Sequence, residues 1–355
     1  MEDSAARRTP RTVREPPLVS IVVPVWNGEA HLRESLDSIL GQTYPRLELI
    51  AVDDASTDST PEILASYGDR IRIHRQPATR GIYGNANDGI ALAQGELVAV
   101  FHADDVYLPE LVEREVEWLE RHPEAGAVFC SDVFVDTSGG ELGRIELPAE
   151  LRGGRPLDYA TVLNALLRHT NVFLRCPTAL VRASVYCDVG VYRDAEFKNT
   201  SDMEMWLRIA RRYPIGVLED HLLLYRRGHG SSSERYHRVR TDPNRFFRIV
   251  ALELDGGGRA VAAPDALRAF EAHRAVDAVL CAVNHYILGN REQALQVLRD
   301  TPLRSLAASG RVERGRMLAL AAALQLLLRL PRLSAVARLF ERYWHGNAPT
   351  PAGQA

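Results

Sequence analysis

The sequence predicts an α/β protein with a mostly parallel central sheet and an all-helical extension at its C-terminus. The first observation is that segments 18–25, 47–52 and 97–101 are nearly continuous apolar runs rich in Val and Ile. Such runs are typical of strands that are buried on both faces. The second observation is that amphipathic segments separate these runs, which indicates repeated βαβ units. The third is that only helical patterns follow residue 258.

Local signals predict the individual elements. Leu and Ile recur at helical spacing across 29–40, and Thr60 followed by Pro61 marks a helix start. Further helices are expected at 83–93, 109–121, 157–168 and 202–212. Further strands are expected at 71–74, 127–135, 178–181 and 222–225. After a Gly-rich linker, helices are expected at 264–286, 291–298, 312–330 and 333–344.

Composition and charge exclude several classes of protein. The chain of 355 residues has 43 Lys plus Arg against 46 Asp plus Glu, a net charge of −3, which argues against a dedicated nucleic-acid binder. Its 4 Cys are widely spaced, so neither a disulfide framework nor a zinc site is indicated, and a reducing cytosol is expected. No signal peptide is recognisable, and no apolar run is long enough to span a membrane.

Carboxylates accumulate where the predicted strands end. The first strand ends in Pro24-Val25-Trp26-Asn27, the second in Asp53-Asp54 and the third in His102-Ala103-Asp104-Asp105. Ligands of open α/β sheets bind at this edge, and clustered carboxylates there indicate a divalent cation. Neither GxxxxGK[ST] nor GxGxxG occurs, so a P-loop nucleotidase and the dinucleotide fingerprint are both excluded.

Five of these fragments resemble family 2 of the glycosyltransferases, which have the GT-A fold. They occur in the family's order and spacing at 19–27, 40–44, 52–58, 87–96 and 102–105, and Ser201-Asp202 with Trp206-Leu207-Arg208 follows later. The resemblance covers about residues 18–235. It implies a GT-A domain at 18–254, with a nucleotide-binding part at 18–135 and an acceptor part at 136–254. A helical extension at 255–345 and disordered tails at 1–17 and 346–355 complete the expected organisation.

The resemblance implies which residues bind the donor and the metal. Asp104 matches the carboxylate of the DxD motif that binds Mg²⁺ or Mn²⁺ on the diphosphate, whereas His102 stands where the first Asp of that motif is usual. His229 is a second expected metal ligand, in a segment whose three serines, 231–233, suggest a lid. The residues expected to bind the nucleotide sugar (UDP-, GDP- or dTDP-linked) are Pro24, Val25, Trp26, Asn27, Glu29, Asp54, Gly81, Asn87, His102, Ala103, Asp104 and Asp105.

Asp202 matches the family's general base, with Ser201 in place of the usual Glu. Taken alone, Ser201-Asp202 is equally consistent with a helix N-cap. Glu204 is the competing carboxylate, but it lies about 200° around the helix from Asp202. Trp118 and Trp206 are expected in the core, whereas Trp26 could pack on the base. Residues expected to face the acceptor are Tyr159, Arg175, Arg182, Asp194 and Glu196.

The resemblance therefore implies an inverting, metal-dependent glycosyltransferase that acts on a hydroxyl of a cell-surface polysaccharide or lipid-linked glycan. Two alternatives stay open: a nucleotidyltransferase that makes nucleotide sugars, and a non-catalytic protein that binds them. Residues 301–345 contain eight Arg, no Lys and two Glu, a net +6. Arg-rich apolar helices either form a bundle or bind anionic lipid, so a cytoplasmic protein with peripheral contact to the inner face of the membrane is expected.

Overall fold

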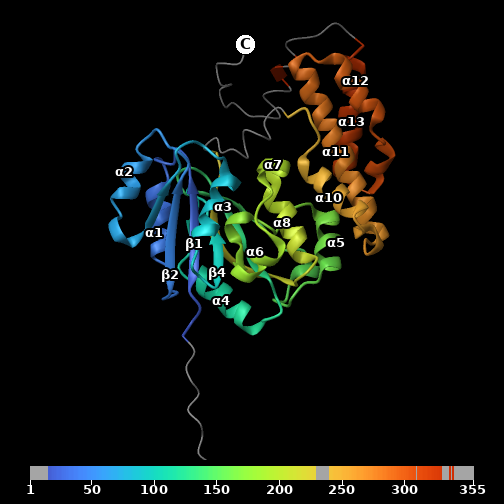
Figure 1. Cartoon of the computed structure of the whole chain (residues 1–355). Coiled ribbons are helices and arrows are strands. Elements are labelled where there is room, and N and C mark those ends of the chain that lie inside the picture. Colours follow the sequence, from blue (N-terminus) through green and yellow to red (C-terminus); the bar gives the residue numbers. More distant parts are fainter. Residues whose placement is uncertain (1–14, 229–239, 309, 330–335, 337, 340–355) are drawn as a thin grey trace, which may run out of the picture.

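The computed structural model describes residues 15–228, 240–308, 310–329, 336, 338 and 339 (Figure 1). Several expectations lie outside these residues: the ligand His229, the serines at 231–233, most of the helix at 333–344 and nearly all of the two tails. Within the described residues, no helix is long and apolar enough to cross a membrane.

The sheet is built from a parallel part and a mixed part. The parallel part has the order β3-β2-β1-β4, and its strands are Arg72–Arg75, Leu47–Asp53, Val19–Val25 and Leu97–Val100. β8 (Leu180–Arg182) is antiparallel to both β4 and β6 and so joins the two parts. β6 (Ala127–Val135) runs parallel to β9 (Ile215–Arg226). Two antiparallel strands complete the sheet, β5 (Val106–Tyr107) on β9 and β7 (Glu141–Arg144) on β6.

Helices cover both faces of this sheet and extend beyond it (Figure 1). Within the α/β part they are α1 Leu32–Leu40, α2 Thr60–Ala65, α3 Ile82–Leu92, α4 Leu111–Arg121, α5 Tyr159–His169, α6 Ala183–Val189, α7 Asp194–Phe197 and α8 Ser201–Ala210. Those that follow are α10 Arg245–Asp255, α11 Pro264–Leu288, α12 Arg291–Asp300 and α13 Arg311–Leu327. Short 3₁₀ segments occur at Gly68–Arg70, Ala149–Leu151, Cys176–Thr178, Lys198–Thr200, Gly258–Ala260 and Leu303–Ala308.

Alternating side chains of β1 explain its continuous apolar sequence. Val22 belongs to the apolar cluster shared with α3, α5 and α8, whereas Ile21 and Val23 belong to the cluster on the opposite face, with α1 and α4. All seven residues of β1 are buried, as a strand between two helical layers requires. Trp118 and Trp206 are each 1% exposed, so their predicted place in the core is confirmed.

The apolar core continues from the sheet into the helical extension. Phe247 on α10 and Phe270 on α11 belong to the same cluster as α5 and α8, while Val279, farther along α11, belongs to a separate cluster with α12 and α13. The 25-residue helix α11 therefore packs on the α/β part at one end and on the bundle at the other. The expected division near residue 255 stays a proposal.

The predicted α/β class is confirmed, but several local predictions were wrong. The helix expected from Glu29 begins at Leu32, because 28–31 form a turn, and the helix expected from Pro109 begins at Leu111. The strand expected at 222–225 is the end of the much longer β9. Thr60 is not the cap of α2: it is the first helical residue, and its buried Oγ1 accepts a hydrogen bond from Gly28 N.

Candidate functional site

The turn at 102–105 follows β4 and is held from two sides. Ser35 on α1 donates a hydrogen bond to His102 O at 3.0 Å, and His102 N donates to the Tyr107 hydroxyl at 2.6 Å. From β9, Arg226 Nε donates to Asp104 O at 3.0 Å, and Arg226 N donates to Asp105 Oδ1 at 2.9 Å. Asp105 is therefore a buried link between this turn and β9.

Three side chains of this turn form a group that could hold a metal ion. Ligand atoms of His102, Asp104 and Asp105 all lie within 4.8 Å of one another. Asp105 is 1% exposed, and its Oδ2 makes no hydrogen bond within the described part of the chain. A buried carboxylate oxygen without a hydrogen-bond donor is costly unless a cation compensates it, so these residues fit a divalent metal.

Burial and neighbouring groups shift the pKa values in this group. Burial raises the pKa of Asp105, and the nearby His102 and Arg226 oppose this only in part. Burial also disfavours the charged form of His102. Its contacts with Asp105, whose Oδ2 lies 3.5 Å from Nδ1, and with Cys176 outweigh burial and raise the pKa of His102 well above its ordinary value.

The residues expected to bind the nucleotide lie at the ends of β1 and β2. Pro24 and Val25 are buried, whereas the Trp26 side chain is 54% exposed beyond β1 and is open to a stacking base. Asn27 takes a left-handed conformation, φ 48°, and its Oδ1 accepts a hydrogen bond from Thr57 N at 2.9 Å. Glu29 Oε2 accepts one from Ser59 N at 3.1 Å. Asn27 and Glu29 thus fix the loop after β1 to the loop after β2.

Asp54 and Asn87 both make structural contacts with protein groups. Asp54 is 3% exposed and accepts hydrogen bonds from the Thr79 hydroxyl at 2.6 Å, Arg80 N at 2.6 Å and Gly81 N at 3.0 Å. It therefore shapes the loop that leads into α3, and its contact with a base or ribose stays a prediction. Asn87 exchanges two hydrogen bonds with the Tyr192 backbone, at 2.8 and 3.0 Å.

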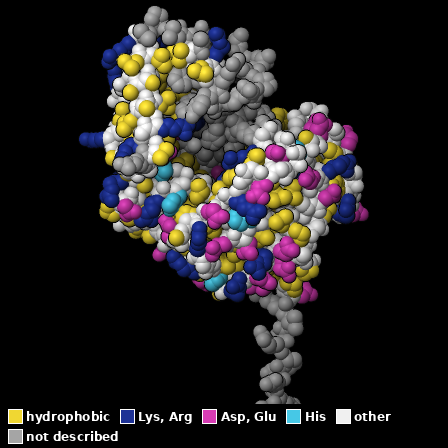
Figure 2. Space-filling view, turned by 180° about the vertical axis from the view of Figure 1, so that it is seen from behind, with side chains coloured by type: hydrophobic (Ala, Val, Ile, Leu, Met, Phe, Trp, Pro, Cys, Tyr) yellow, Lys and Arg dark blue, Asp and Glu magenta, His cyan; other side chains and the backbone are white. Residues whose placement is uncertain are grey.

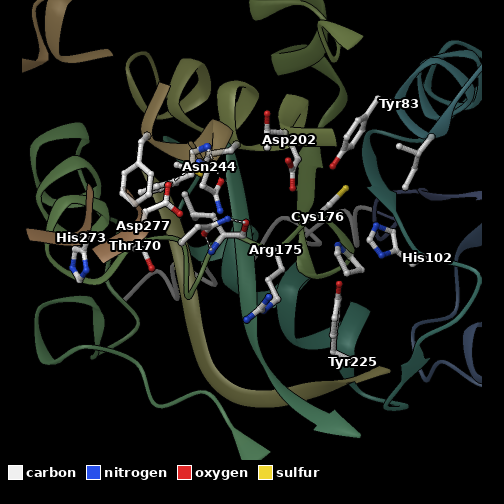
Figure 3. Close-up of a pocket in the computed structure, with 18 of the residues that line it drawn as sticks. Tyr83, His102, Thr170, Arg175, Cys176, Asp202, Tyr225, Asn244, His273 and Asp277 are labelled. Carbon is white, nitrogen blue, oxygen red and sulfur yellow. Dashed lines mark hydrogen bonds between the residues drawn. The ribbon is translucent and has the colours of Figure 1, made fainter. Parts of the chain in front are cut away.

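A cavity of about 460 Å³ opens beside the turn (Figure 3). Asp202 lines it between His102 on one side and Asn244 with Asp277 on the other. Its wall therefore comes from the loop after β4, from the start of α8, and from the segment around α10 and α11. Among the residues that line it and that the sequence prediction missed are Ile82, Tyr83, Thr170, Asn171, Cys176, Tyr225, Asn244, Phe246, Phe247, His273, Val276, Asp277 and Leu280.

Asp202 is an ionisable group at the wall of this cavity. Burial raises the pKa of Asp202, while hydrogen bonds, among them one with Tyr83, and the nearby His102 counteract part of the rise. Neither Asp202 nor Ser201 is the N-cap of α8, because the capping position is Thr200 and the Ser201 hydroxyl donates to Lys198 O at 2.6 Å. The capping position is thus misplaced in the N-cap interpretation, although the Asp202 carboxylate does interact with a backbone N–H of the first turn, that of Met203.

Glu204 does not compete with Asp202 for the cavity. Its carboxylate pairs with Arg208 at 2.9 Å and with Arg193 at 3.3 Å. Because α8 turns by about 100° per residue, two positions along the helix place Glu204 on a different side. The sequence argument that separated these two carboxylates is supported by these contacts.

Of the residues expected to face the acceptor, only Arg175 lines the cavity. Its Nε lies 2.5 Å from Asp132 Oδ2, so the two charges pair at the cavity wall. The Tyr159 hydroxyl instead donates to Glu253 at 2.6 Å, and Arg182 donates to the carbonyls of Ala125 and Leu119. Asp194 and Glu196 do not line the cavity either. The missed residues had no motif to mark them, because distant segments bring them together only in the fold.

Comparisons with known proteins agree with this arrangement. The profile of the family described as Glycosyl transferase family 2 matches residues 20–190. A Rickettsia felis protein described as an uncharacterized glycosyltransferase is 30% identical over 224 residues, 62% of this chain and 35% of that protein. The chain thus spans about a third of the length of that relative.

Two solved structures show the same fold. The S. aureus TarS 1–349 structure in complex with UDP-GlcNAc is 19% identical, with a TM-score of 0.59, and the match covers 93% of this chain and 92% of that one. The mannosyltransferase PcManGT from Pyrobaculum calidifontis, in complex with GDP-Man and Mn²⁺, is 21% identical, with a TM-score of 0.50 over 93% and 87% of the chains. The GT-A fold is thus confirmed, and residues 20–190 belong to family 2 of the glycosyltransferases.

Proposed function

We propose that the protein transfers a sugar from a nucleotide-sugar donor to a hydroxyl group of an acceptor, with inversion at the anomeric carbon. The observation that carries the proposal is the position of Asp202, partly buried at the wall of a cavity that begins beside the carboxylate turn at 102–105. A base on the acceptor side and charge neutralisation on the diphosphate side are the two requirements of such a transfer.

The residues of the chain divide this work between them. Asp202 removes the proton from the attacking hydroxyl, and Tyr83, through its hydrogen bond, holds the Asp202 carboxylate toward the cavity. One displacement at the anomeric carbon then breaks the bond to the diphosphate, so no covalent intermediate with the protein is needed. General-base catalysis of this kind contributes about 10²–10⁴-fold.

On the donor side, Asp104 would hold Mg²⁺ or Mn²⁺, with His229 as a further ligand outside the described residues. The metal would supply positive charge for the leaving diphosphate. The ligand atoms grouped around Asp104 support this, as does the complex of PcManGT with GDP-Man and Mn²⁺. The donor is a UDP-, GDP- or dTDP-sugar, for which UDP-GlcNAc bound to TarS is a further precedent.

On the acceptor side, the far end of the cavity lies against the helical extension. Asn244, at the start of α10, and Asp277, on α11, line this end together with Arg175. We place a polysaccharide or lipid-linked glycan acceptor here, with its hydroxyl directed at Asp202. Because residues of the extension form this wall, the extension takes part in acceptor binding.

Apolar side chains exposed on the extension support contact with the inner face of the membrane by a cytoplasmic protein. Leu318 is 42% and Leu326 62% exposed on α13, and Arg316 and Arg329 near them are also exposed. Figure 2 shows apolar and basic side chains over the extension, whereas acidic side chains are spread over the α/β part. Such a helix face combines apolar insertion with attraction to anionic lipid.

The test of this function is the Asp202→Asn variant, assayed for release of nucleoside diphosphate and for transfer to a glycan panel. We expect transfer to fall by about 10²–10⁴-fold while the affinity for the donor nucleotide is retained. Glu204→Gln is the matched control, because Glu204 pairs with Arg208 rather than lining the cavity. Full activity of the Asp202→Asn protein would refute the assignment.

The same assay separates the alternatives. A transferase releases nucleoside diphosphate slowly from its donor without any acceptor, whereas a non-catalytic binding protein does not. A nucleotidyltransferase would instead release pyrophosphate when given a sugar phosphate and a nucleoside triphosphate. The family match at residues 20–190 favours the transferase.

A further inference from the structure

The ring of His102 has one nitrogen beside a buried carboxylate and one nitrogen without a hydrogen bond. Nδ1 lies 3.5 Å from Asp105 Oδ2, and Nε2 meets no hydrogen-bond partner within the residues that the structure describes, although the Cys176 thiol is also close to the ring. Metal-binding histidines typically have this arrangement: a carboxylate orients the ring through one nitrogen, and the other nitrogen binds the ion. Asp105 is itself held by Arg226 N at 2.9 Å, so the orientation of the ring is supported from β9.

The same ring is close to the expected metal ligand. Ligand atoms of His102, Asp104 and Asp105 lie within 4.8 Å of one another, and the group is therefore compact enough to share one ion after small side-chain rotations. The buried Asp105 Oδ2, which lies 3.5 Å from His102 Nδ1, adds negative charge beside the same group of ligand atoms.

We propose that His102 is a nitrogen ligand of the metal that Asp104 binds, and that it makes the site selective for Mn²⁺ or Co²⁺ over Mg²⁺. This rests on the proposed function, which assigns the metal to Asp104 but leaves its identity open. Mg²⁺ takes oxygen ligands in strict octahedral geometry, whereas an imidazole nitrogen suits first-row transition metals.

Asp105 then has a different role from Asp104. It is a positioning residue, because its oxygens contact Arg226 N and the His102 ring. Asp104 is only partly buried and supplies the oxygen ligand. The division explains why two adjacent carboxylates follow His102: one holds the ring and the other binds the ion.

The experiment measures Mn²⁺ binding to the full-length protein directly, with UDP and separately with GDP present. Pulsed EPR of bound Mn²⁺ detects a directly coordinated ¹⁴N nucleus. We expect a ¹⁴N coupling in the wild-type protein and its loss in His102→Asp. In titrations, we expect the preference for Mn²⁺ over Mg²⁺ to fall by about tenfold in this variant, because an oxygen ligand replaces the nitrogen.

Three further variants keep the result interpretable. His74→Asp changes an exposed histidine on β3 and is expected to retain the coupling. Asp104→Asn is expected to weaken the binding of both metals. A ¹⁴N coupling that persists in His102→Asp, or that disappears only in His229→Ala, overturns the proposal, as does tight Mn²⁺ binding without any coupling in the wild-type protein.

The outcome does not depend on sugar transfer. If Asp202→Asn retained full transfer activity, the assignment of the base would fail while the EPR result still decided the role of His102. Conversely, if the bound Mn²⁺ had only oxygen ligands, the proposed function would stand and this inference would be wrong. Thermal unfolding of each variant checks that its fold is intact.

Discussion

Arg226, at the end of β9, forms an ion pair with Glu34 on α1 at 2.6 Å, across 192 positions of the sequence. The Arg226 side chain is 2% exposed, and its guanidinium also donates to the carbonyls of Asp104, Asp136 and Thr137. One buried side chain therefore ties the turn at 102–105 to α1 and to the loop after β6.

Replacing Arg226 by Met is expected to lower the free energy of unfolding by about 2–3 kcal/mol, because three part-buried carbonyls and the Glu34 carboxylate lose their donor. Urea unfolding measures this loss. Arg227→Met is the control: Arg227 is exposed and lies over the Phe134 ring at 3.7 Å, so we expect a change below about 1 kcal/mol. Equal losses in the two variants would contradict the role given to Arg226.

The contact between Tyr83 and Asp202 predicts a pH dependence. Burial raises the pKa of Asp202 above that of an ordinary Asp, and the Tyr83 hydrogen bond counteracts part of this rise. The base works only when ionised, so transfer is lost as the pH falls through the raised pKa. In Tyr83→Phe the pKa rises further, and the acidic limb of kcat/KM should move up by about one pH unit.

The control for this shift is Tyr44→Phe, because the Tyr44 hydroxyl donates its hydrogen bond to Pro17 O and not to Asp202. A limb that moves equally in both variants, or that stays in place in Tyr83→Phe, would show that Tyr83 does not act on the base. A change in kcat/KM without a shift of its acidic limb would indicate that Tyr83 acts on substrate binding instead.

The sequence was most informative where a residue's role depends on near neighbours along the chain. The strands 19–25 and 47–53, the turn at 102–105 and the position of Asp202 were all predicted, because apolar runs and short motifs mark them. The wall of the cavity was not predicted. Asp277 and Asn244 come together because Asp277 Oδ2 accepts a hydrogen bond from Asn244 N at 3.0 Å, a contact that no local pattern reports.

The short strands β5, β7 and β8 were missed or misplaced for a related reason. β5 has two residues and β8 three, too few for a periodic pattern to appear. β8 also joins the two parts of the sheet, so the antiparallel share of the sheet was underestimated from sequence. Its place is fixed by pairing with β4 and β6, not by its own composition.

Close packing of α3 on β1 makes one glycine of α3 essential. A Cβ at Gly89 would lie 2.2 Å from Val22 Cγ1 and 3.0 Å from Val52 Cγ2, so Gly89→Ala forces the helix away from the sheet. We expect a loss of about 2–3 kcal/mol in the free energy of unfolding. Gly84→Ala, in the same helix, would place its Cβ 3.3 Å from Arg80 Cβ.

Gly84→Ala therefore serves as the matched control for Gly89→Ala. Its helix propensity improves by about 1 kcal/mol, which offsets the mild crowding, and its stability should stay near that of the wild type. Denaturant midpoints of the two variants measure the difference. A Gly89→Ala protein as stable as Gly84→Ala would mean that α3 does not pack this closely on β1.

The apolar face of α13 predicts binding to anionic vesicles. Removal of the chain after residue 256 is unsuitable as a test, because it also removes Phe270, which belongs to the core shared with α5 and α8.

The substitution Leu326→Glu is a better test, because this side chain is 62% exposed and can be replaced without disturbing the bundle. We expect the full-length protein to float with vesicles that contain anionic lipid, and the variant to float at least about fivefold less, because a charge replaces an inserting apolar group. Leu324→Ala, at a fully buried position of the same helix, lowers stability but leaves that face intact. Equal flotation of Leu326→Glu and wild type would show that α13 does not contact the membrane.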